Sequence, residues 1–357
     1  MENPAYPTNR EFLNKLQYEP GVDYLYRPFY QPNVDYIYKP VDEPGIDYVY
    51  KPNDRSHYGF LYEEEDEDRL HDYLRTGHPT RASDRKCCNC KKCYNSQPCS
   101  TEEYLVHERK SVAEDNIEYA KRFPFLVDKS HVETISNTKH QKISRKLGVL
   151  PTYEFSTIYV EKCTSYEAVM DAYRRDPKSQ ICVLNFASPV TPGGEFRNGQ
   201  PTQEASLCRH TLLYPTLEGN SMYNKGNEMD GSDVMIYSPN VSVFRDTMYK
   251  EIVHPFKINV ISATPVDNRK CEVVAGAKIM ERRIRKIINL AASKKPDVLI
   301  LGAFGCGALK NDPKVISKIF QTVLVKEGMR YHFPQIIFPV SEDPLIFDIF
   351  RARFPGH

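Results

Sequence analysis

The sequence predicts an α/β protein, a three-layer α/β/α sandwich with a mixed sheet, preceded by a largely disordered N-terminal region. From about residue 101, short apolar runs alternate with segments of helical spacing, and two of these runs end in glycine loops that lead into helices. Residues 1–100 instead carry frequent proline and tyrosine, an acidic run and little helical periodicity. We therefore expect two parts, 1–100 without a fold of its own and 101–357 folded.

The strands and helices of the sandwich follow from the apolar pattern. The runs predicted to be strands are 158–162, 181–186, 234–237, 258–262, 298–301 and 335–339. Helical spacing covers 102–122, 279–292 and 315–325. A capping box of Thr164 and Glu167 predicts a further helix through Tyr173. Asp312 and Pro313 suit the N-cap and the first position of the helix near the C-terminus.

The loop after the second predicted strand has the composition of a phosphate-binding turn. It carries Pro192, Gly193 and Gly194, and it ends where Gln203 and Glu204 open an apolar helix. A strand, a glycine loop and a polar helix start bring bare backbone N–H groups against phosphates. A glycine pair alone is more often an ordinary turn, so the loop needs support from elsewhere in the chain.

A second glycine loop supplies that support. The predicted strand 298–301 runs directly into Gly302, Gly305 and Gly307, and a helix follows. Two strand–loop–helix junctions can face each other across a cleft at the carboxyl ends of a sheet, where open α/β folds bind ligands. One loop could then cradle a diphosphate while the other frames a ribose.

At these residues the chain resembles the microbial-type poly(ADP-ribose) glycohydrolases, a branch of the macrodomain fold. The resemblance covers about 158–357, and a weaker helical part begins near Thr101. It rests on separate stretches in one order: VLNFASPVTPGG, QEASL, LLYPTL, VMIYSPNVSVFRD, INVISATP and LGAFGCGALKNDP. Several matches in order are far more specific than one loop. The resemblance implies an ADP-ribose pocket and hydrolysis of the ribose–ribose glycosidic bond, with no metal or other cofactor required.

The same resemblance assigns roles to individual residues. It implies that the ribose-side loop and its helix contribute Ser188, Pro192, Gly193, Gly194, Gln203 and Glu204, and the diphosphate loop Phe304, Gly305, Cys306 and Gly307. For Phe304, stacking on ribose or adenine and plugging the loop onto the core both stay open. Cys306 lies between glycines with no partner base in the pattern, so we interpret it as a small packing residue rather than a nucleophile.

Two departures from the family pattern bear on catalysis. The third glycine of the family's loop is Glu195 here, and the second glutamate of its Gln-Glu-Glu motif is Ala205. In the resemblance, Glu204 holds the distal ribose, while the missing second carboxylate protonates the departing oxygen. Cleavage through an oxocarbenium-like state needs such an acid, and its loss lowers the rate by ~10²–10⁴-fold.

We therefore expect an ADP-ribose-binding protein with lost or weakened hydrolysis. An active glycohydrolase that uses Glu204 or Glu195 remains an alternative. Glu195 flanks the same loop, so it can be read either as a replacement acid or as a solvent-facing glutamate. A third interpretation is a tyrosine-repeat adaptor whose folded domain is indifferent to ligand. The expected ligand is ADP-ribose or poly(ADP-ribose) on modified proteins.

The N-terminal region contains a repeat of twelve residues. The copies are PGVDYLYRP at 20–28, PNVDYIYKP at 32–40 and PGIDYVYKP at 44–52. Proline at both ends of each copy blocks helix and keeps the unit extended. The repeats are either a disordered tyrosine-rich tail or three copies of a docking motif for a protein partner. In the second case, multivalency would strengthen the binding of that partner.

A cysteine cluster follows the repeats. Cys87, Cys90, Cys93 and Cys99 stand in a C-x2-C-x2-C-x5-C pattern. Four thiolates so close can hold a structural zinc ion, although structural sites usually split their ligands into two separated pairs. A linker with free or palmitoylated thiols is the alternative.

Charge and composition limit the other function classes. The chain has 357 residues with 48 basic and 47 acidic side chains, so no global field favours direct DNA binding or a membrane surface. No apolar run approaches the roughly 20 residues of a membrane span. The first residues lack the apolar stretch of a secretory signal, so we expect a cytoplasmic or nuclear location.

Overall fold

The structure is a computed structural model that describes residues 36–38, 48–50, 101–147, 152–224, 232–270, 273–341 and 343–355. The chain divides into two compact units, Met1–Cys87 and Cys88–His357. The expected zinc ligands Cys87, Cys90, Cys93 and Cys99 lie outside the described residues.

Within the first unit the structure describes two short strands. β1 (Tyr36–Tyr38) and β2 (Tyr48–Tyr50) are the central residues of the second and third repeats. They pair antiparallel, with Tyr36 opposite Tyr50 and Tyr38 opposite Tyr48. The repeats thus supply matching strand segments at equal positions of successive copies.

The second unit is built on a mixed sheet of seven strands. Their order is β3-β6-β7-β5-β8-β9-β4, in which the run from β7 to β4 is parallel and β6 pairs antiparallel with both β3 and β7. The strands are β3 (Glu133–Ile135), β4 (Thr157–Glu161), β5 (Ile181–Phe186), β6 (Met235–Arg245), β7 (Glu251–Ala263), β8 (Val298–Ile300) and β9 (Gln335–Pro339). All six predicted strands are confirmed. β3 was not predicted, and β6 and β7 extend well beyond the predicted runs 234–237 and 258–262.

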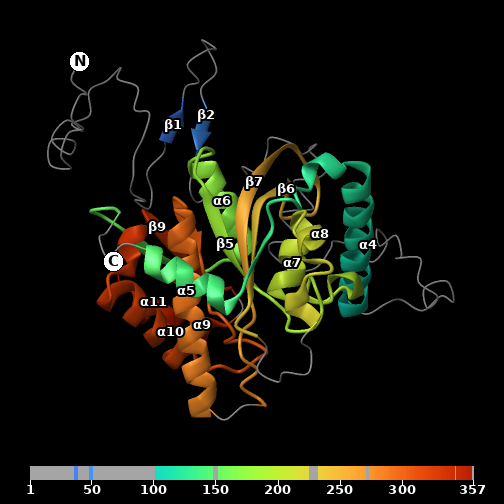
Figure 1. The fold of residues 1–357 in the computed structure, drawn as a ribbon. Coiled ribbons are helices and arrows are strands. Elements are labelled where there is room, and N and C mark those ends of the chain that lie inside the picture. The colour runs from blue at the N-terminus through green and yellow to red at the C-terminus, as the bar shows by residue number, and fades with distance from the viewer. Residues whose placement is uncertain are drawn as a thin grey trace. The chain divides into compact units, whose positions relative to one another are not determined.

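Helices cover both faces of this sheet (Figure 1). They are α4 (Thr101–Arg122), α5 (Asn137–Lys146), α6 (Ser165–Arg175), α7 (Gln203–His210), α8 (Tyr214–Leu217), α9 (Val273–Lys294), α10 (Pro313–Gln321) and α11 (Pro344–Arg353). Shorter turns are η1 (Pro124–Leu126), η2 (Phe196–Asn198), η3 (Ser221–Asn224), η4 (Thr322–Lys326) and η5 (Met329–His332). No helix among the described residues is long and apolar enough to cross a bilayer.

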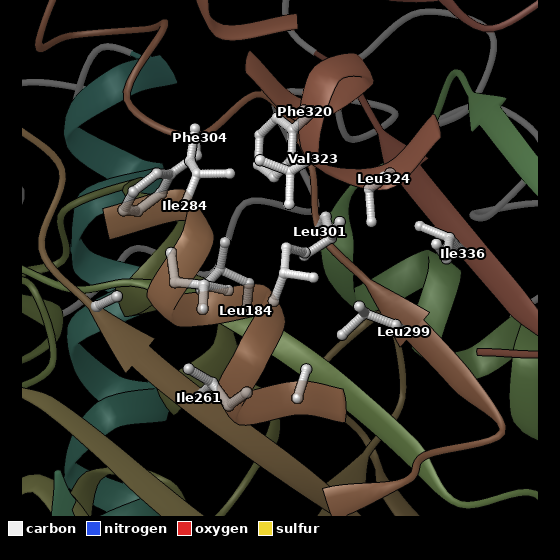
Figure 2. Packing of buried hydrophobic residues seen from close by; sticks show 14 of the residues in the cluster. Leu184, Ile261, Ile284, Leu299, Leu301, Phe304, Phe320, Val323, Leu324 and Ile336 are labelled. Carbon is white, nitrogen blue, oxygen red and sulfur yellow. The ribbon is translucent and has the colours of Figure 1, made fainter. Parts of the chain in front are cut away.

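The alternation of side chains along β5 shows why two core layers form. Cys182 and Leu184 belong to one apolar cluster with α9, α10 and α11, whereas Ile181 and Val183 belong to a second cluster with α4, α6 and α7. Figure 2 shows the first cluster, in which Leu184 lies among side chains from neighbouring strands and helices. The predicted three-layer α/β/α sandwich with a mixed sheet is confirmed.

The predicted helix starts are also confirmed in their capping contacts. Thr164 and Glu167 form the complete capping box of α6. The Asp312 carboxylate accepts the N–H of Lys314 at 2.8 Å and caps α10, with Pro313 as its first residue. These caps fix where the loops after β4 and β8 turn into helices.

Candidate functional site

The two glycine loops leave the sheet at the same edge. β5 and β8 are neighbouring parallel strands, with Ile181 opposite Val298 and Val183 opposite Ile300. Because parallel strands end at one edge, the loops 187–202 and 301–312 begin side by side. This confirms that the two loops share one edge of the sheet.

Phe186, at the end of β5, joins the two loops. Its ring lies edge-on to Phe304 with centroids 5.5 Å apart. A Cβ atom on Gly302 would stand 2.9 Å from the Phe186 ring, and Gly302 has φ +100°. The close approach of the loops at their base therefore requires glycine at this position.

Glu204, the second residue of α7, is buried and surrounded by hydrogen-bond donors. Its Oε2 accepts the N–H of Ser188 at 2.7 Å. Its Oε1 accepts the Tyr223 hydroxyl at 2.7 Å and Asn185 Nδ2 at 3.2 Å. The N–H of Gly193 also donates to this carboxylate. A carboxylate offers about four acceptor sites, so these donors satisfy it.

Burial and hydrogen bonding act in opposite directions on Glu204. Burial raises the pKa of its carboxyl group from 4.5 to about 7, while the hydrogen bonds from Ser188, Tyr223, Asn185 and Gly193 lower it. The effect of desolvation on the pKa is therefore larger than the combined effect of the four hydrogen bonds. The group changes charge near neutral pH, the range in which a carboxyl can take part in proton transfer.

The backbone of Gly193 and Gly194 packs directly against this carboxylate and its neighbours. Both glycines are in the left-handed region, at φ +77° and +57°. A Cβ on Gly194 would lie 3.0 Å from Glu204 Oε2 and 2.8 Å from Thr202 Oγ1. On Gly193 it would lie 2.9 Å from the Tyr214 ring. The loop therefore needs glycine for both its conformation and its closeness to Glu204.

Glu195, in the place of the family's third glycine, keeps a glycine-like backbone. Its φ is +63°, a conformation that costs a residue with a Cβ roughly 1–2 kcal/mol. Its side chain is exposed: Oε1 accepts the Thr191 hydroxyl at 2.9 Å, and Oε2 accepts Asn198 Nδ2. Both carboxylate oxygens are thus bonded within the loop.

Ala205 is completely buried. It belongs to the same apolar cluster as Phe196 and Leu207, with no exposed surface. Its N–H donates to Thr202 Oγ1 at 3.2 Å, because Thr202 caps α7. Position 205 thus offers a methyl group and no titratable atom.

The other predicted residues of this loop hold it to the sheet. Gln203 accepts the N–H of Phe186 at 2.8 Å and donates to the Leu184 carbonyl at 2.9 Å. The Ser188 hydroxyl accepts the N–H groups of Val190 and Thr191, which makes a local turn around half-buried Pro192.

The loop after β8 is held mainly by apolar packing. Phe304 is completely buried in the first core cluster, the position expected of a core plug. Gly305 has φ +78°, and its carbonyl accepts Asn311 Nδ2 at 3.0 Å. Burial raises the pKa of the Cys306 thiol to about 12, so this thiol stays protonated and unreactive. Beside Gly307 a Cβ would meet open space.

Helix α4 braces the first loop from the outside. Arg109 Nε donates to the Gly199 carbonyl at 2.6 Å. Asn116 Nδ2 donates to the carbonyls of Cys208 and Arg209, at 2.8 and 2.7 Å, and so satisfies the last turn of α7. The helix before the sandwich therefore positions both ends of the segment that carries Glu204.

A cavity of about 610 Å³ lies between α4 and the outer part of the first glycine loop, away from Glu204 and from the loop after β8. Its walls come from α4, η1, η2 and α8 and include Ile117, Arg197 and Tyr214. None of the site residues predicted from sequence lines it. The cavity meets the loop 187–202 at Arg197 of η2 and also includes Tyr214, whose ring approaches Gly193.

Within the described part of the chain, no group of three or more metal-ligating side chains is close enough to hold an ion. The site is instead a carboxyl group among hydrogen-bond donors, next to backbone loops. Three residues of this site were not predicted from the sequence: Tyr223, Thr202 and Ser262, whose hydroxyl accepts Asn185 Nδ2 at 3.0 Å. Thr202 before the Gln-Glu pair is a recognisable N-cap signal. The contact of Tyr223 with Glu204 depends on the path of the chain between α8 and β6 and has no local signal.

The family model and the solved structures that match this chain all describe poly(ADP-ribose) glycohydrolases. Residues 93–246 match the family model described as the microbial-type PARG catalytic domain, PARG being poly(ADP-ribose) glycohydrolase. The structure is similar to that of the poly(ADP-ribose) glycohydrolase from Thermomonospora curvata, with 24% identity and a TM-score of 0.65, over 70% of this chain and 100% of that one. The same enzyme bound to the inhibitor ADP-HPD matches with a TM-score of 0.61, 24% identity and the same coverage. The enzyme from Deinococcus radiodurans in complex with ADP-ribose matches with a TM-score of 0.57 and 25% identity, over 63% of this chain and 94% of that one. No curated protein matches in a sequence search.

Proposed function

We propose that this chain, which belongs to the microbial-type poly(ADP-ribose) glycohydrolase family, binds ADP-ribose on modified proteins and hydrolyses poly(ADP-ribose) weakly or not at all. One observation carries the second half of the proposal: the position of the second catalytic glutamate holds Ala205, whose methyl group is fully buried.

Binding is supported by the shared edge of the two loops and by what the similar enzymes bind. The solved relatives hold ADP-ribose or ADP-HPD. In this chain Gly305 and Gly307 would offer backbone N–H groups to the diphosphate, whereas the N–H of Cys306 donates to the Ala303 carbonyl at 3.0 Å. Ser188, Pro192, Gly193, Gly194, Gln203 and Glu204 would frame the distal ribose.

Weak hydrolysis follows from the chemistry of the departing group. A ribose hydroxyl leaves readily only if it receives a proton as the bond breaks. Ala205 has none to give. Glu195 is exposed, and both its oxygens are bonded to Thr191 and Asn198. Without the acid, the rate falls by ~10²–10⁴-fold, or roughly 3–5 kcal/mol of barrier.

A working glycohydrolase that relies on Glu204 alone is the second candidate. The raised pKa of Glu204 favours it, because this carboxyl holds a proton over part of the neutral range. Its four donors weigh against it, because they all stabilise the charged form. The tyrosine repeats, in either case, are proposed to bind a protein partner independently of the pocket.

Calorimetry with ADP-ribose and a polymer-hydrolysis assay on one preparation test the proposal. We expect saturable binding of ADP-ribose. We expect the polymer to release ADP-ribose no faster than it does in buffer without the protein. A ligand at 100 times its Kd should stabilise the fold by ~2.7 kcal/mol, which a thermal shift would detect independently. Rapid polymer hydrolysis would favour the second candidate. No binding in either experiment would leave the ligand-indifferent adaptor.

A further inference from the structure

We infer that the pocket releases ADP-ribose linked through a carboxylate ester, as on an Asp or Glu side chain, while leaving ribose–ribose and serine-linked bonds intact. This inference rests on the proposed function, because it requires ADP-ribose to occupy the loops around Glu204. It assigns a substrate class to a site that lacks the acid its family uses.

The leaving group decides which of these linkages needs the missing acid. When the bond from C1″ of the distal ribose to oxygen breaks, the oxygen takes the electron pair. A sugar or serine hydroxyl would leave as a strongly basic alkoxide unless it is protonated. The carboxylate of Asp or Glu has an ordinary pKa near 4 and leaves as a stable anion. Losing the acid therefore slows cleavage of the glycosidic bonds to ribose and serine hydroxyls much more than cleavage of the ester.

The surroundings of Glu204 offer no substitute acid among the residues that the structure describes. Tyr223 uses its hydroxyl proton to bond Glu204, and burial raises its pKa well above the ordinary value. Cys306 is buried behind the second loop. His210, at the other end of α7, bonds the Ser206 carbonyl and stacks on Tyr166 at 3.8 Å, so its ring is committed elsewhere.

The hydrogen bonds of Glu204 stabilise its charged form, whereas its burial favours the protonated form, so this carboxylate can take up a proton near neutral pH. Two backbone N–H groups, a hydroxyl and an amide converge on it within the fold's interior. Such a carboxylate stabilises the positive charge that develops on the ribose ring. The step then balances: the ester carboxylate leaves with the electron pair, the oxygen of water bonds to C1″, and the proton of water passes to Glu204 and then to solvent.

Asn185 provides a way for Glu204 to keep that proton during the step. Asn185 is fully buried; its Nδ2 donates to Glu204 Oε1 at 3.2 Å and to Ser262 Oγ at 3.0 Å, while its Oδ1 has no partner. Turning the amide by half a turn exchanges Oδ1 and Nδ2. The oxygen would then accept from protonated Glu204 and from the Ser262 hydroxyl. The oxygen thus gains two donors in the protonated state, while the amide nitrogen moves to the place where Oδ1 had no partner.

Three linkages presented to the same preparation of the 357-residue chain test the inference. The substrates are a peptide ADP-ribosylated on glutamate, the same peptide ADP-ribosylated on serine, and poly(ADP-ribose). Released ADP-ribose is measured after subtraction of spontaneous hydrolysis, and ADP-ribose binding is measured by calorimetry on the same preparation. We expect the ester to be cleaved at least ~10²-fold faster than the serine linkage or the polymer.

Glu204→Gln provides the residue-level control. Glutamine has nearly the same volume but cannot accept the proton of water, so we expect ester release to fall by ~10²-fold. Circular dichroism and the unfolding midpoint show whether this variant folds. If it does not, the comparison of linkages on the wild-type protein still carries the test.

The outcomes separate the two proposals. Absence of ADP-ribose binding would overturn the proposed function and the inference with it. Binding without ester cleavage above the spontaneous rate would overturn the inference alone. Equal cleavage of ester and polymer would also overturn it, because the pocket would then contain a working acid.

Discussion

The two glycine loops at the edge of the sheet are held in place by different forces. The loop after β5 is organised around a buried carboxylate, with Ser188 and Gly193 donating to Glu204. The loop after β8 is organised around buried apolar side chains, chiefly Phe304 and Cys306. The position of the first loop is therefore sensitive to charge and proton transfer, whereas that of the second loop depends on apolar packing. The same backbone motif can thus serve two purposes, depending on what lies beneath it.

Truncating Phe304 should produce the largest effect on stability. Phe304→Ala removes a fully buried ring from the first core cluster, so we expect the free energy of unfolding to fall by about 3–5 kcal/mol. Urea unfolding followed by fluorescence or circular dichroism measures it. Val190→Ala in the first loop is the control, since Val190 is 53% exposed and should change stability by less than about 0.5 kcal/mol. Similar losses in both variants would contradict the apolar anchoring of the second loop.

The charge-centred loop should respond to pH. The pKa of Glu204 is raised in the folded state from 4.5 to about 7, so the folded protein binds the proton more tightly than the unfolded chain. Stability linked to this group is fully present below about pH 4.5 and is lost as the pH rises to about 7, by a total of about 3 kcal/mol. Urea unfolding at pH 5 and pH 8 should show this loss in the wild type.

Other buried groups oppose this trend, so the comparison needs a variant. His140 and His210 have pKa values lowered by burial to about 4 and about 3, and they add stability as the pH rises from those values toward 6.5. Glu204→Gln removes only the glutamate contribution. From pH 5 to pH 8, the change in the free energy of unfolding should therefore be more favourable in the variant than in the wild type, by roughly 2–3 kcal/mol. Identical pH dependence in both proteins would show that Glu204 titrates normally.

Alanine substitutions at one glycine of each loop should differ in their cost to stability, and this effect is smaller than the two above. Gly194→Ala places a Cβ at 2.8–3.0 Å from Thr202 and Glu204 in a left-handed backbone, and we expect a loss of about 1–3 kcal/mol in unfolding free energy. Gly307→Ala meets open space without positive φ, and it should cost under about 0.5 kcal/mol. Chemical unfolding of both variants measures the difference. Equal costs would mean that the first loop is not packed as closely on Glu204 as its geometry indicates.

Much of the fold was predictable because it depends on local patterns. Apolar runs predicted every strand of the seven-stranded sheet except β3, and the caps at Thr164 and Asp312 predicted two helix starts. β3 was missed because it is only three residues long and is stabilised by pairing with β6, which no local pattern encodes. The extension of β6 and β7 into a long hairpin has the same cause: the pairing, not the propensity of each run, sets the length.

The site was predictable in its loops and less so in its electrostatics. Glycine-containing loops after two strands predicted that both loops lie at one edge, because strand direction follows from the α/β alternation. The burial of Glu204 and its contacts with Tyr223 and Asn185 come from residues distant in sequence. The left-handed backbone of Glu195 was hidden as well, since glutamate rarely adopts it.

Hydrolysis of poly(ADP-ribose) by Ala205→Glu, with Ala205→Gln as the matched control, tests the central claim most directly. Both variants place a long polar side chain at a fully buried position, but only the glutamate can carry a proton. Among folded preparations that bind ADP-ribose equally by calorimetry, we expect Ala205→Glu to hydrolyse the polymer ~10²–10⁴-fold faster than the wild type, and Ala205→Gln to show no gain. Rapid polymer hydrolysis by the wild type, or no gain in a folded and ligand-binding Ala205→Glu, would contradict the claim that residue 205 limits catalysis.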